Sequence, residues 1–255
     1  MTGIKMSAII SAAGAGTRLG ASGNKTLLKI EGKTVLERSL EPFLKQEALA
    51  ELLISYRESD FNAYREIVDR VQSERTGHPL SIRLVEGGKE RRDSVYHCLK
   101  ELNVEHDYVM IHDCARPFFP AKLFRAYLKE IAAGQEAIIP YLPSPDTLLY
   151  VHKNRMGGEL LLEKKDLSKI DRSLLLRIQT PQCFSMRLAR ALKTWMEENT
   201  ELYSDESSAV LAMGEKIKLI RGSGYLNKIT DAEDWEFARA IYHSFRNGEN
   251  DDKRS

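Results

Sequence analysis

The chain of 255 residues is poor in the features that mark secreted, membrane-spanning or nucleic-acid-binding proteins. Its three cysteines, Cys98, Cys114 and Cys183, lack metal-type spacing, which argues against a disulfide framework or a zinc site and favours a reduced, intracellular protein. No apolar run approaches the ~20 residues of a membrane span, and the short run after Lys5 is too brief for a signal peptide. A net charge of +1 creates no overall field for nucleic acid or an acidic membrane. We expect a cytoplasmic protein in which any anion-binding site is local.

What the sequence does have is a regular alternation of strand-like and helical segments. With 42% hydrophobic and 29% charged residues, it can form a sizeable core and a charged surface. A first apolar strand starts near Ser7, and further strand-like runs lie at Leu52–Tyr56, Leu80–Glu86, Asp107–His112, Ala137–Leu142 and Lys216–Arg221. Helical spacing is present at Val35–Lys45, Phe61–Val71, Asp93–Leu102, Ala121–Ala133, Ser185–Glu198 and Ser204–Met213. The alternation predicts an α/β fold with a Rossmann-like, mostly parallel sheet, helices on both faces, and ligands beyond the carboxyl ends of the strands.

Residues 143–172 interrupt this alternation. The segment opens with Pro-Ser-Pro, carries charged runs, lacks a full helix-plus-strand unit and is long for a plain loop. We expect a projecting arm of short strands that a second subunit could cover, with a surface insertion as the alternative. Further on, Thr230-Asp231-Ala232-Glu233 resembles a helix start, and this helix is expected to reach about Phe245. The prediction is a single domain over residues 1–245, with the arm at about 143–172 and a disordered tail at 246–255.

The first strand ends in a loop of small residues that is followed by two cations. The loop is Ala12-Ala13-Gly14-Ala15-Gly16-Thr17, and the cations are Arg18 and Lys25. Small residues let backbone N–H groups approach a polyanion closely. The dinucleotide fingerprint fails because its glycines are spaced one residue too far apart, and the Walker loop fails because Gly23-Asn24-Lys25-Thr26 interrupts Gly-Lys-Ser/Thr. The pattern that fits is A-A-G-x-G-x-R-[LM] followed by Lys, a nucleotidyltransferase loop. A turn that only reverses the chain is the alternative.

A second loop follows the third predicted strand. Gly87-Gly88 permits a tight turn with close backbone approach, and Arg91 lies three residues further on. The helix that is expected to start near Asp93 offers free N–H groups and a positive dipole end. Backbone groups and Ser94 could read a pyrimidine base there. In the alternative interpretation, Asp93 or Ser94 is only a helix N-cap.

A third loop, His112-Asp113-Cys114-Ala115-Arg116-Pro117, follows the fourth predicted strand. Asp113 suits a magnesium ion or a ligand hydroxyl, since Mg²⁺ prefers carboxylate and phosphate oxygens. Arg116 suits bidentate phosphate binding. A local ion pair between Asp113 and Arg116 is the alternative. We expect His112 to be a hydrogen-bonded structural histidine and the stretch Asp205-Glu206-Ser207-Ser208 to open a helix.

Taken together, these stretches resemble the 2-C-methyl-D-erythritol 4-phosphate cytidylyltransferase family, which uses CTP in the non-mevalonate isoprenoid pathway. The resemblance covers roughly residues 6 to 242. It rests on the three loops and, in order, on Asp146-Thr147, Asp171-Arg172, Thr180-Pro181-Gln182 and Asn227-Lys228-Ile229-Thr230. Thr26 stands where the family usually has glutamine, and Cys114 stands where alanine is commoner. A sister family that attaches CTP to ribitol 5-phosphate shares the first loop and Thr-Pro-Gln, so ribitol 5-phosphate remains the alternative acceptor.

The resemblance implies a role for each matching residue. Arg18 and Lys25 would hold the triphosphate and stabilise the reacting α-phosphate. The nucleotide would contact the small-residue loop (Ala12, Ala13, Gly14, Ala15, Gly16, Thr17) and the second loop (Gly87, Arg91, Ser94). The sugar-phosphate pocket would contain Asp113, Arg116, Thr147, Arg172, Thr180 and Lys228. The arm of one subunit would interlock with that of its partner in a homodimer, with Thr147 or Arg172 serving the neighbouring site.

The implied reaction is an in-line attack by the sugar phosphate on the α-phosphorus of Mg·CTP, with release of pyrophosphate. The attacking oxygen is already ionised at neutral pH, since the second pKa of a phosphate is about 6, so no general base is required. Two other classes of function are alternatives. An NAD(P)-dependent oxidoreductase is disfavoured by the glycine spacing, and a catalytically inactive nucleotide-binding regulator is disfavoured by the presence of Arg18, Lys25 and Asp113.

Overall fold

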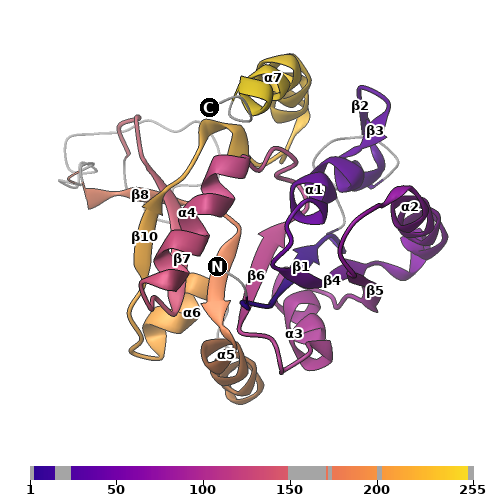
Figure 1. The fold of residues 1–255 in the computed structure, drawn as a ribbon. Coiled ribbons are helices and arrows are strands. Elements are labelled where there is room, and N and C mark those ends of the chain that lie inside the picture. Colours follow the sequence, from indigo (N-terminus) through magenta and orange to yellow (C-terminus); the bar gives the residue numbers. More distant parts are fainter. Residues whose placement is uncertain (1–2, 15–23, 149–170, 172–173, 200–202, 252–255) are drawn as a thin grey trace.

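The computed structural model describes residues 3–14, 24–148, 171, 174–199 and 203–251 of the chain. In these residues eight strands form one sheet (Figure 1). The strands are β1 (Met6–Ser11), β4 (Leu49–Tyr56), β5 (Ser81–Glu86), β6 (Tyr108–Asp113), β7 (Ala137–Pro143), β8 (Leu176–Ile178), β9 (Gln182–Ser185) and β10 (Lys218–Arg221). Their order is β10-β7-β9-β6-β1-β4-β5, and β8 pairs with β7. This arrangement confirms the predicted Rossmann-like sheet.

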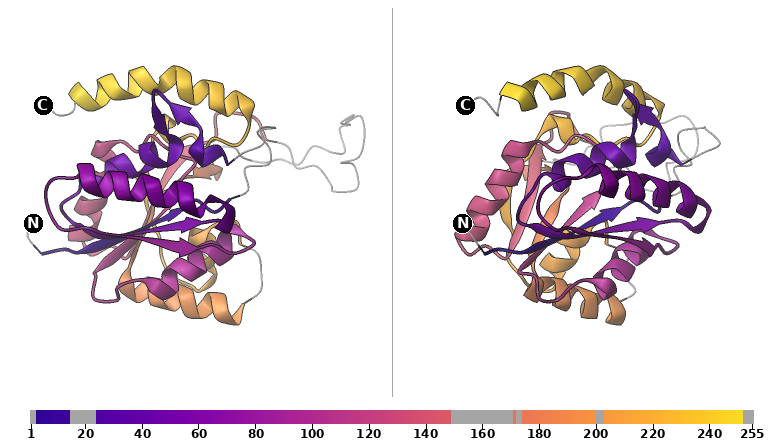
Figure 2. Two further views of the ribbon diagram at one scale, coloured as in Figure 1. Left: turned by 90° about the vertical axis from the view of Figure 1, so that its right-hand side faces the viewer. Right: turned by 45° about the vertical axis from the view of Figure 1, so that its right-hand side comes forward.

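The centre of the sheet is apolar because helices cover it on both faces. In β1, Ala8 and Ile10 pack into one core while Ile9, between them, packs into the other. One face carries α1 (Val35–Leu44), α2 (Phe61–Glu74), α4 (Ala121–Ala132) and α7 (Ala232–Asp251), and the other carries α3 (Arg91–Glu101), α5 (Met186–Glu198) and α6 (Glu206–Ala212). Figure 2 shows the two helical layers above and below the sheet in its left-hand view. No helix in the described ranges is long and apolar enough to cross a membrane.

The pairing differs from the prediction at β8 and β9, which the sequence analysis did not identify as strands. β1, β4, β5 and β6 pair in parallel, as do β7 and β10. β9, in contrast, lies antiparallel between β6 and β7. It has only four residues, Gln182-Cys183-Phe184-Ser185, all of them buried. So short a run has no periodicity from which its type could be recognised.

A hairpin and three short 3-10 helices were not predicted either. A hairpin of β2 (Lys29–Ile30) and β3 (Lys33–Thr34) precedes α1, and its turn places Glu31 and Gly32 at φ of 46° and 78°. Two positive φ values match the primed turns that join hairpin strands, and glycine adopts such angles without strain. Three short 3-10 helices also lie among the described residues: η2 (Lys25–Leu27), η3 (Glu58–Asp60) and η7 (Gly224–Leu226).

The C-terminal helix continues beyond its predicted end near Phe245. α7 reaches Asp251, so residues 246–251, which were predicted to be disordered, are helical. Phe245 packs on Phe118, and Arg246 lies 3.9 Å from Glu41 of α1. Once packing has nucleated a helix, each further residue adds a hydrogen bond at little cost, which explains the extension. Residues 252–255 lie outside the described residues.

The predicted arm at 143–172 lies largely outside the described residues. At its borders β7 and β8 pair antiparallel, with Pro143 opposite Leu176. The chain therefore leaves the sheet and returns to it at one place.

Candidate active site

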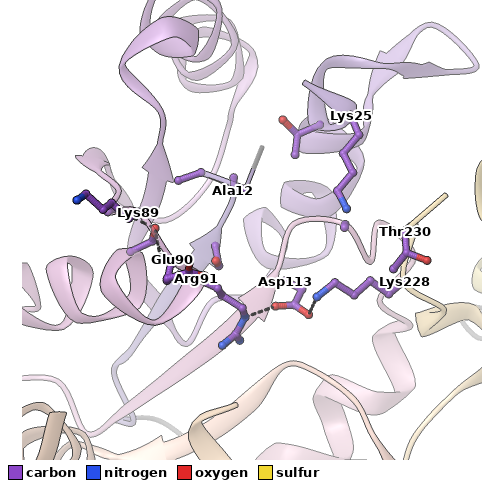
Figure 3. A pocket seen from close by; sticks show the side chains of 15 residues that line it. Ala12, Lys25, Lys89, Glu90, Arg91, Asp113, Lys228 and Thr230 are labelled. Atoms are coloured by element: carbon purple, nitrogen blue, oxygen red, sulfur yellow. Dashed lines mark hydrogen bonds and ion pairs between the residues drawn. The ribbon is translucent and has the colours of Figure 1, made fainter. Parts of the chain in front are cut away.

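A cavity of about 280 Å³ lies at the carboxyl ends of β1, β5 and β6 (Figure 3). Its lining comes from the three loops that the sequence analysis expected at this edge, together with residues near the start of α7 and before the β2–β3 hairpin. The lining residues are Ser11, Ala12, Ala13, Gly14, Lys25, Thr26, Gly88, Lys89, Glu90, Arg91, Ser94, Asp113, Ala115, Lys228 and Thr230. Parallel strands that end together bring these distant segments into one pocket.

The start of the first loop is fixed by hydrogen bonds from neighbouring elements. Ser55 Oγ accepts from the backbone N–H groups of Ala12, at 3.0 Å, and Ala13, at 3.4 Å. The Tyr64 hydroxyl donates to the carbonyl oxygen of Ala12 at 3.0 Å. These two N–H groups are thus engaged within the protein.

The second loop packs directly on the first. A Cβ atom built on Gly87 would lie 2.4 Å from the Cβ of Ala13 and 2.8 Å from Ser94 Oγ, so only glycine fits. Buried Ser94 accepts from the N–H of Gly88 at 3.1 Å and donates to the carbonyl of Glu90 at 3.1 Å. The N-cap of α3 is Glu90, in a capping box with Asp93. Ser94 therefore shapes the Gly87-Gly88 loop from a position within the first turn of the helix. Neither Asp93 nor Ser94, the two alternatives from the sequence, is the N-cap.

Asp113 lies at the centre of a cluster of charges. Its two carboxylate oxygens accept from Arg91 Nε at 2.8 Å and from Lys228 Nζ at 2.9 Å, and Arg116 Nε lies 3.5 Å away. Figure 3 shows Arg91 and Lys228 approaching Asp113 from opposite sides. Burial raises the pKa of Asp113, but Arg91, Lys228 and Arg116 overcome that effect and hold the pKa well below its usual value. Asp113 is therefore an ionised acceptor at the floor of the pocket.

Arg91 has a second acidic partner, Glu206, which the sequence predicts only as part of a helix start. Its Nη1 and Nη2 donate to the two carboxylate oxygens of Glu206 at 2.7 and 2.9 Å. The residues are 115 positions apart in the chain. A charged helix opening is visible in the sequence, but no local pattern identifies a partner at that separation.

His112 and Thr180 support Asp113 from behind. The N–H of Asp113 donates to Thr180 Oγ1 at 3.0 Å, and the two ring nitrogens of His112 lie 3.0 Å from Thr180 Oγ1 and 3.0 Å from the carbonyl oxygen of Arg116. Burial lowers the pKa of His112 to about 4, so the ring is neutral at pH 7. The expectation of a hydrogen-bonded structural histidine is confirmed.

Lys25 reaches the pocket from η2, the 3-10 helix that precedes the β2–β3 hairpin. Its Nζ donates to the carbonyl oxygen of Ile229 at 2.8 Å, which joins the first loop region to the segment that carries Lys228. Asp234, in the first turn of α7, accepts from the N–H of Thr230 at 2.8 Å and from Asn227 Nδ2 at 3.2 Å. The start of α7 thus holds the segment 227–230 against the pocket.

The predicted site residues fall into four groups. Eight line the cavity: Ala12, Ala13, Gly14, Lys25, Arg91, Ser94, Asp113 and Lys228. Three lie behind its lining: Gly87, Arg116 and Thr180. Arg116 donates to the carbonyl of Leu226 at 2.7 Å. Thr147 is exposed and does not line it. The remaining five lie outside the described residues: Ala15, Gly16, Thr17, Arg18 and Arg172.

The residues around Asp113 do not fit a metal ion that the protein itself would hold. Each carboxylate oxygen already accepts from a cation within 2.9 Å, and two guanidinium groups and an ammonium surround the carboxylate. Across the described part of the chain, no three His, Cys, Asp or Glu side chains gather into a group that could hold a metal. The prediction of Asp113 as a metal ligand therefore finds no support in this geometry.

Comparison with known proteins places these residues in a family. A family model described as 2-C-methyl-D-erythritol 4-phosphate cytidylyltransferase matches residues 6–244. Curated proteins of that name from Bacillus cytotoxicus and Thermotoga neapolitana are 31% and 33% identical to the chain; each alignment covers 92% of it and 96% and 95% of the relative, respectively. The solved 4-diphosphocytidyl-2C-methyl-D-erythritol synthase of Anaerococcus prevotii has a TM-score of 0.76 at 26% identity, covering 94% of this chain and 96% of that one. The enzyme of that family from Thermus thermophilus has a TM-score of 0.69 at 28% identity, covering 93% and 98%.

Proposed function

The chain belongs to the 2-C-methyl-D-erythritol 4-phosphate cytidylyltransferase family, and from this membership and the pocket we propose that it joins CTP to 2-C-methyl-D-erythritol 4-phosphate, releasing pyrophosphate. The observation that carries the proposal is the composition of the pocket. Backbone-rich loops with little side-chain bulk form one side, and Lys25 and Lys228 extend into the pocket from segments about two hundred residues apart. That arrangement suits two anionic substrates that have to be brought together.

The chemistry asks the protein for alignment and charge compensation. The attacking phosphate oxygen is ionised at pH 7, so no proton has to be removed. Two anions must instead be held in line while negative charge grows on the α-phosphate and the leaving pyrophosphate. We assign Lys25, with Arg18, to the triphosphate. We assign Lys228 to the acceptor phosphate. Its hydrogen bond to Asp113 would keep the ammonium group in place.

Asp113 is assigned to a hydroxyl group of the substrate. Its carboxylate is ionised and held between cations, which leaves it able to accept a hydrogen bond but not to act as a general base. Arg116 and Thr180 are assigned an indirect role in the acceptor pocket, because they contact Asp113 from outside the cavity lining.

Mg²⁺ is assigned to the substrate, as the counter-ion that enters with the phosphates of CTP. Mg²⁺ commonly keeps several waters and is bound mainly through substrate phosphates. This assignment agrees with the lack of fit at Asp113, and no protein ligand is proposed for the ion.

We also propose that each chain forms a single domain over residues 1–245 and that two chains form a homodimer through the arm at 143–172. Support comes from the borders of the arm, where Leu148 is 43% exposed and Leu174 is 78% exposed. Apolar side chains left in water beside a long segment are typical of a surface that a partner covers. Thr147 and Arg172 are assigned to the neighbouring subunit's site.

Pyrophosphate release tests the proposal. Purified protein is incubated with Mg²⁺, each of the four nucleoside triphosphates in turn, and either 2-C-methyl-D-erythritol 4-phosphate or ribitol 5-phosphate. We expect release only with CTP and the erythritol phosphate. Turnover with ribitol 5-phosphate alone would reassign the acceptor, and no release with any pair would reject the activity.

A further inference from the structure

We propose that Glu206 is a positioning residue of this site: it holds the Arg91 guanidinium against Asp113, so that Arg91 acts as a bridge and not as a phosphate-binding cation. The inference rests on the proposed function and deepens it. It also gives a role to two stretches that the function does not use directly, Thr180-Pro181-Gln182 and Asp205-Glu206-Ser207-Ser208.

Three hydrogen bonds fix the guanidinium plane of Arg91. Nη1 and Nη2 donate to the two oxygens of Glu206 at 2.7 and 2.9 Å, and Nε donates to Asp113 at 2.8 Å. Glu206 itself is only 3% exposed. A planar guanidinium that is bound at one end by two parallel bonds and at its side by a third has one orientation left. The orientation of the Asp113 carboxylate follows from it.

Glu206 can impose this orientation because the sheet holds it. It is the first residue of α6, and the N-cap of that helix is Asp205. Fully buried Gln182 of β9 donates to Asp205 at 2.9 Å and accepts from the N–H of Ser207 at 2.8 Å. Gln182 pairs with Ile111 of β6, two residues before Asp113. The same antiparallel strand pair thus anchors both carboxylates that Arg91 joins.

The charges of the cluster give the arrangement its function. Asp113 and Glu206 supply two negative charges, against three positive charges from Arg91, Arg116 and Lys228. If Glu206 were neutral, Asp113 alone would face three cations, and Arg91 would be attracted to the acceptor phosphate. Glu206 therefore keeps Arg91 away from that phosphate, which Lys228 binds, and it keeps Asp113 oriented toward the substrate hydroxyl.

Steady-state kinetics of Glu206→Gln test the inference, since glutamine keeps the shape and removes the charge. We expect kcat/KM for the acceptor to fall by about 10- to 100-fold, the size of effect that a displacement of about 1 Å in a site can have. The KM for CTP should stay within about threefold, because Glu206 contacts the second loop through Arg91, to which the proposal assigns no contact with the nucleotide. A matched control is Glu215→Gln, which removes the same charge from an exposed pair with Arg187 and should change neither constant.

A double-mutant comparison separates positioning through Arg91 from a general effect on folding. If Glu206 acts through Arg91, Glu206→Gln should add less than a twofold loss in an Arg91→Met background. Equal losses in both backgrounds, or wild-type acceptor kinetics in Glu206→Gln, would overturn the proposal. Should Glu206→Gln not fold, Glu206→Asp keeps the charge but cannot span both Nη atoms; an acceptor-specific loss supports the proposal and unchanged kinetics refute it.

One readout does not depend on activity. In ¹⁵N NMR spectra, the Nε–H of Arg91 should be protected from solvent exchange in the wild-type protein and in Glu215→Gln, and lose that protection in Glu206→Gln. Persistence of the protected signal in Glu206→Gln would refute the role of Glu206. Pyrophosphate release by the wild-type protein decides the proposed function separately, so the two failures can be told apart.

Discussion

Replacing Gly87 by alanine tests the contact between the first and second loops of the pocket. The new Cβ would lie 2.4 Å from the Cβ of Ala13, 2.8 Å from Ser94 Oγ and 3.1 Å from the carbonyl oxygen of Tyr56. Ordinary contact begins at 3.4 Å, so the loops have to separate by about 1 Å. None of these atoms is the end of a long flexible side chain, and the strain therefore falls on the backbone of both loops.

The expected cost follows from that overlap. Overpacking of this kind costs about 1–3 kcal/mol of unfolding free energy, less the fraction of a kcal/mol that alanine gains by restricting the unfolded chain. For a chain of this size, each kcal/mol corresponds to about 2–4 °C in Tm, so we expect a fall of roughly 2–10 °C. Because the separation opens the wall of the pocket, the affinity for CTP should fall as well.

Thermal melting with and without Mg·CTP measures both effects. Gly224→Ala is the matched control, since a Cβ there meets no atom within 4 Å, and its Tm should stay near that of the wild-type protein. Gly14→Ala also meets no protein atom within 4 Å, so it should keep the Tm and lose only the shift that CTP produces. If Gly87→Ala melts within 1 °C of the wild-type protein and binds CTP equally well, the two loops do not meet as described.

Three further predictions concern single residues of the site. Lys25→Ala, like Arg18→Ala, should leave the fold intact and lower kcat by at least about 10²-fold, the usual loss for one contact to a developing charge; near-normal turnover would remove that residue from the mechanism. Asp234→Asn should raise the KM for the acceptor several-fold by loosening segment 227–230, whereas exposed Glu233→Gln on the same turn should not; equal KM values would show that α7 does not hold this segment. His112 has a pKa of about 4 in the folded chain against 6.5 unfolded, so unfolding takes up a proton between these values and stability falls as the pH drops from 6.5 to 4, by up to about 3 kcal/mol. His112→Gln should lack this part of the acid dependence in melting curves, and an unchanged profile would contradict the buried neutral ring.

Local chemistry explains why much of the fold could be read in advance. The strand at Met6–Ser11 is a short, continuous apolar run that ends at a loop of small residues, and the helix at Ala121–Ala132 is long and periodic. Their predicted ends are correct within about two residues. The sequence does not indicate β9, because its four buried residues show no periodicity. The predicted end of α7 lies too early, because the last turns of the helix are polar. In each case the deciding interaction is with a neighbour that is distant in the chain.

The sequence by itself determined which segments would reach the functional edge, because a parallel sheet brings the ends of its strands together whatever their side chains are. It also determined the family, since the motifs stand in a fixed order over most of the chain. Only the tertiary structure decided how the charges are shared: that Asp113 is held by Arg91 and Lys228, and that Glu206, 115 residues from Arg91, completes the cluster. The physical reason is that hydrogen bonds and ion pairs act over about 3 Å in space, and no local pattern in the sequence encodes such a distance between separate strands.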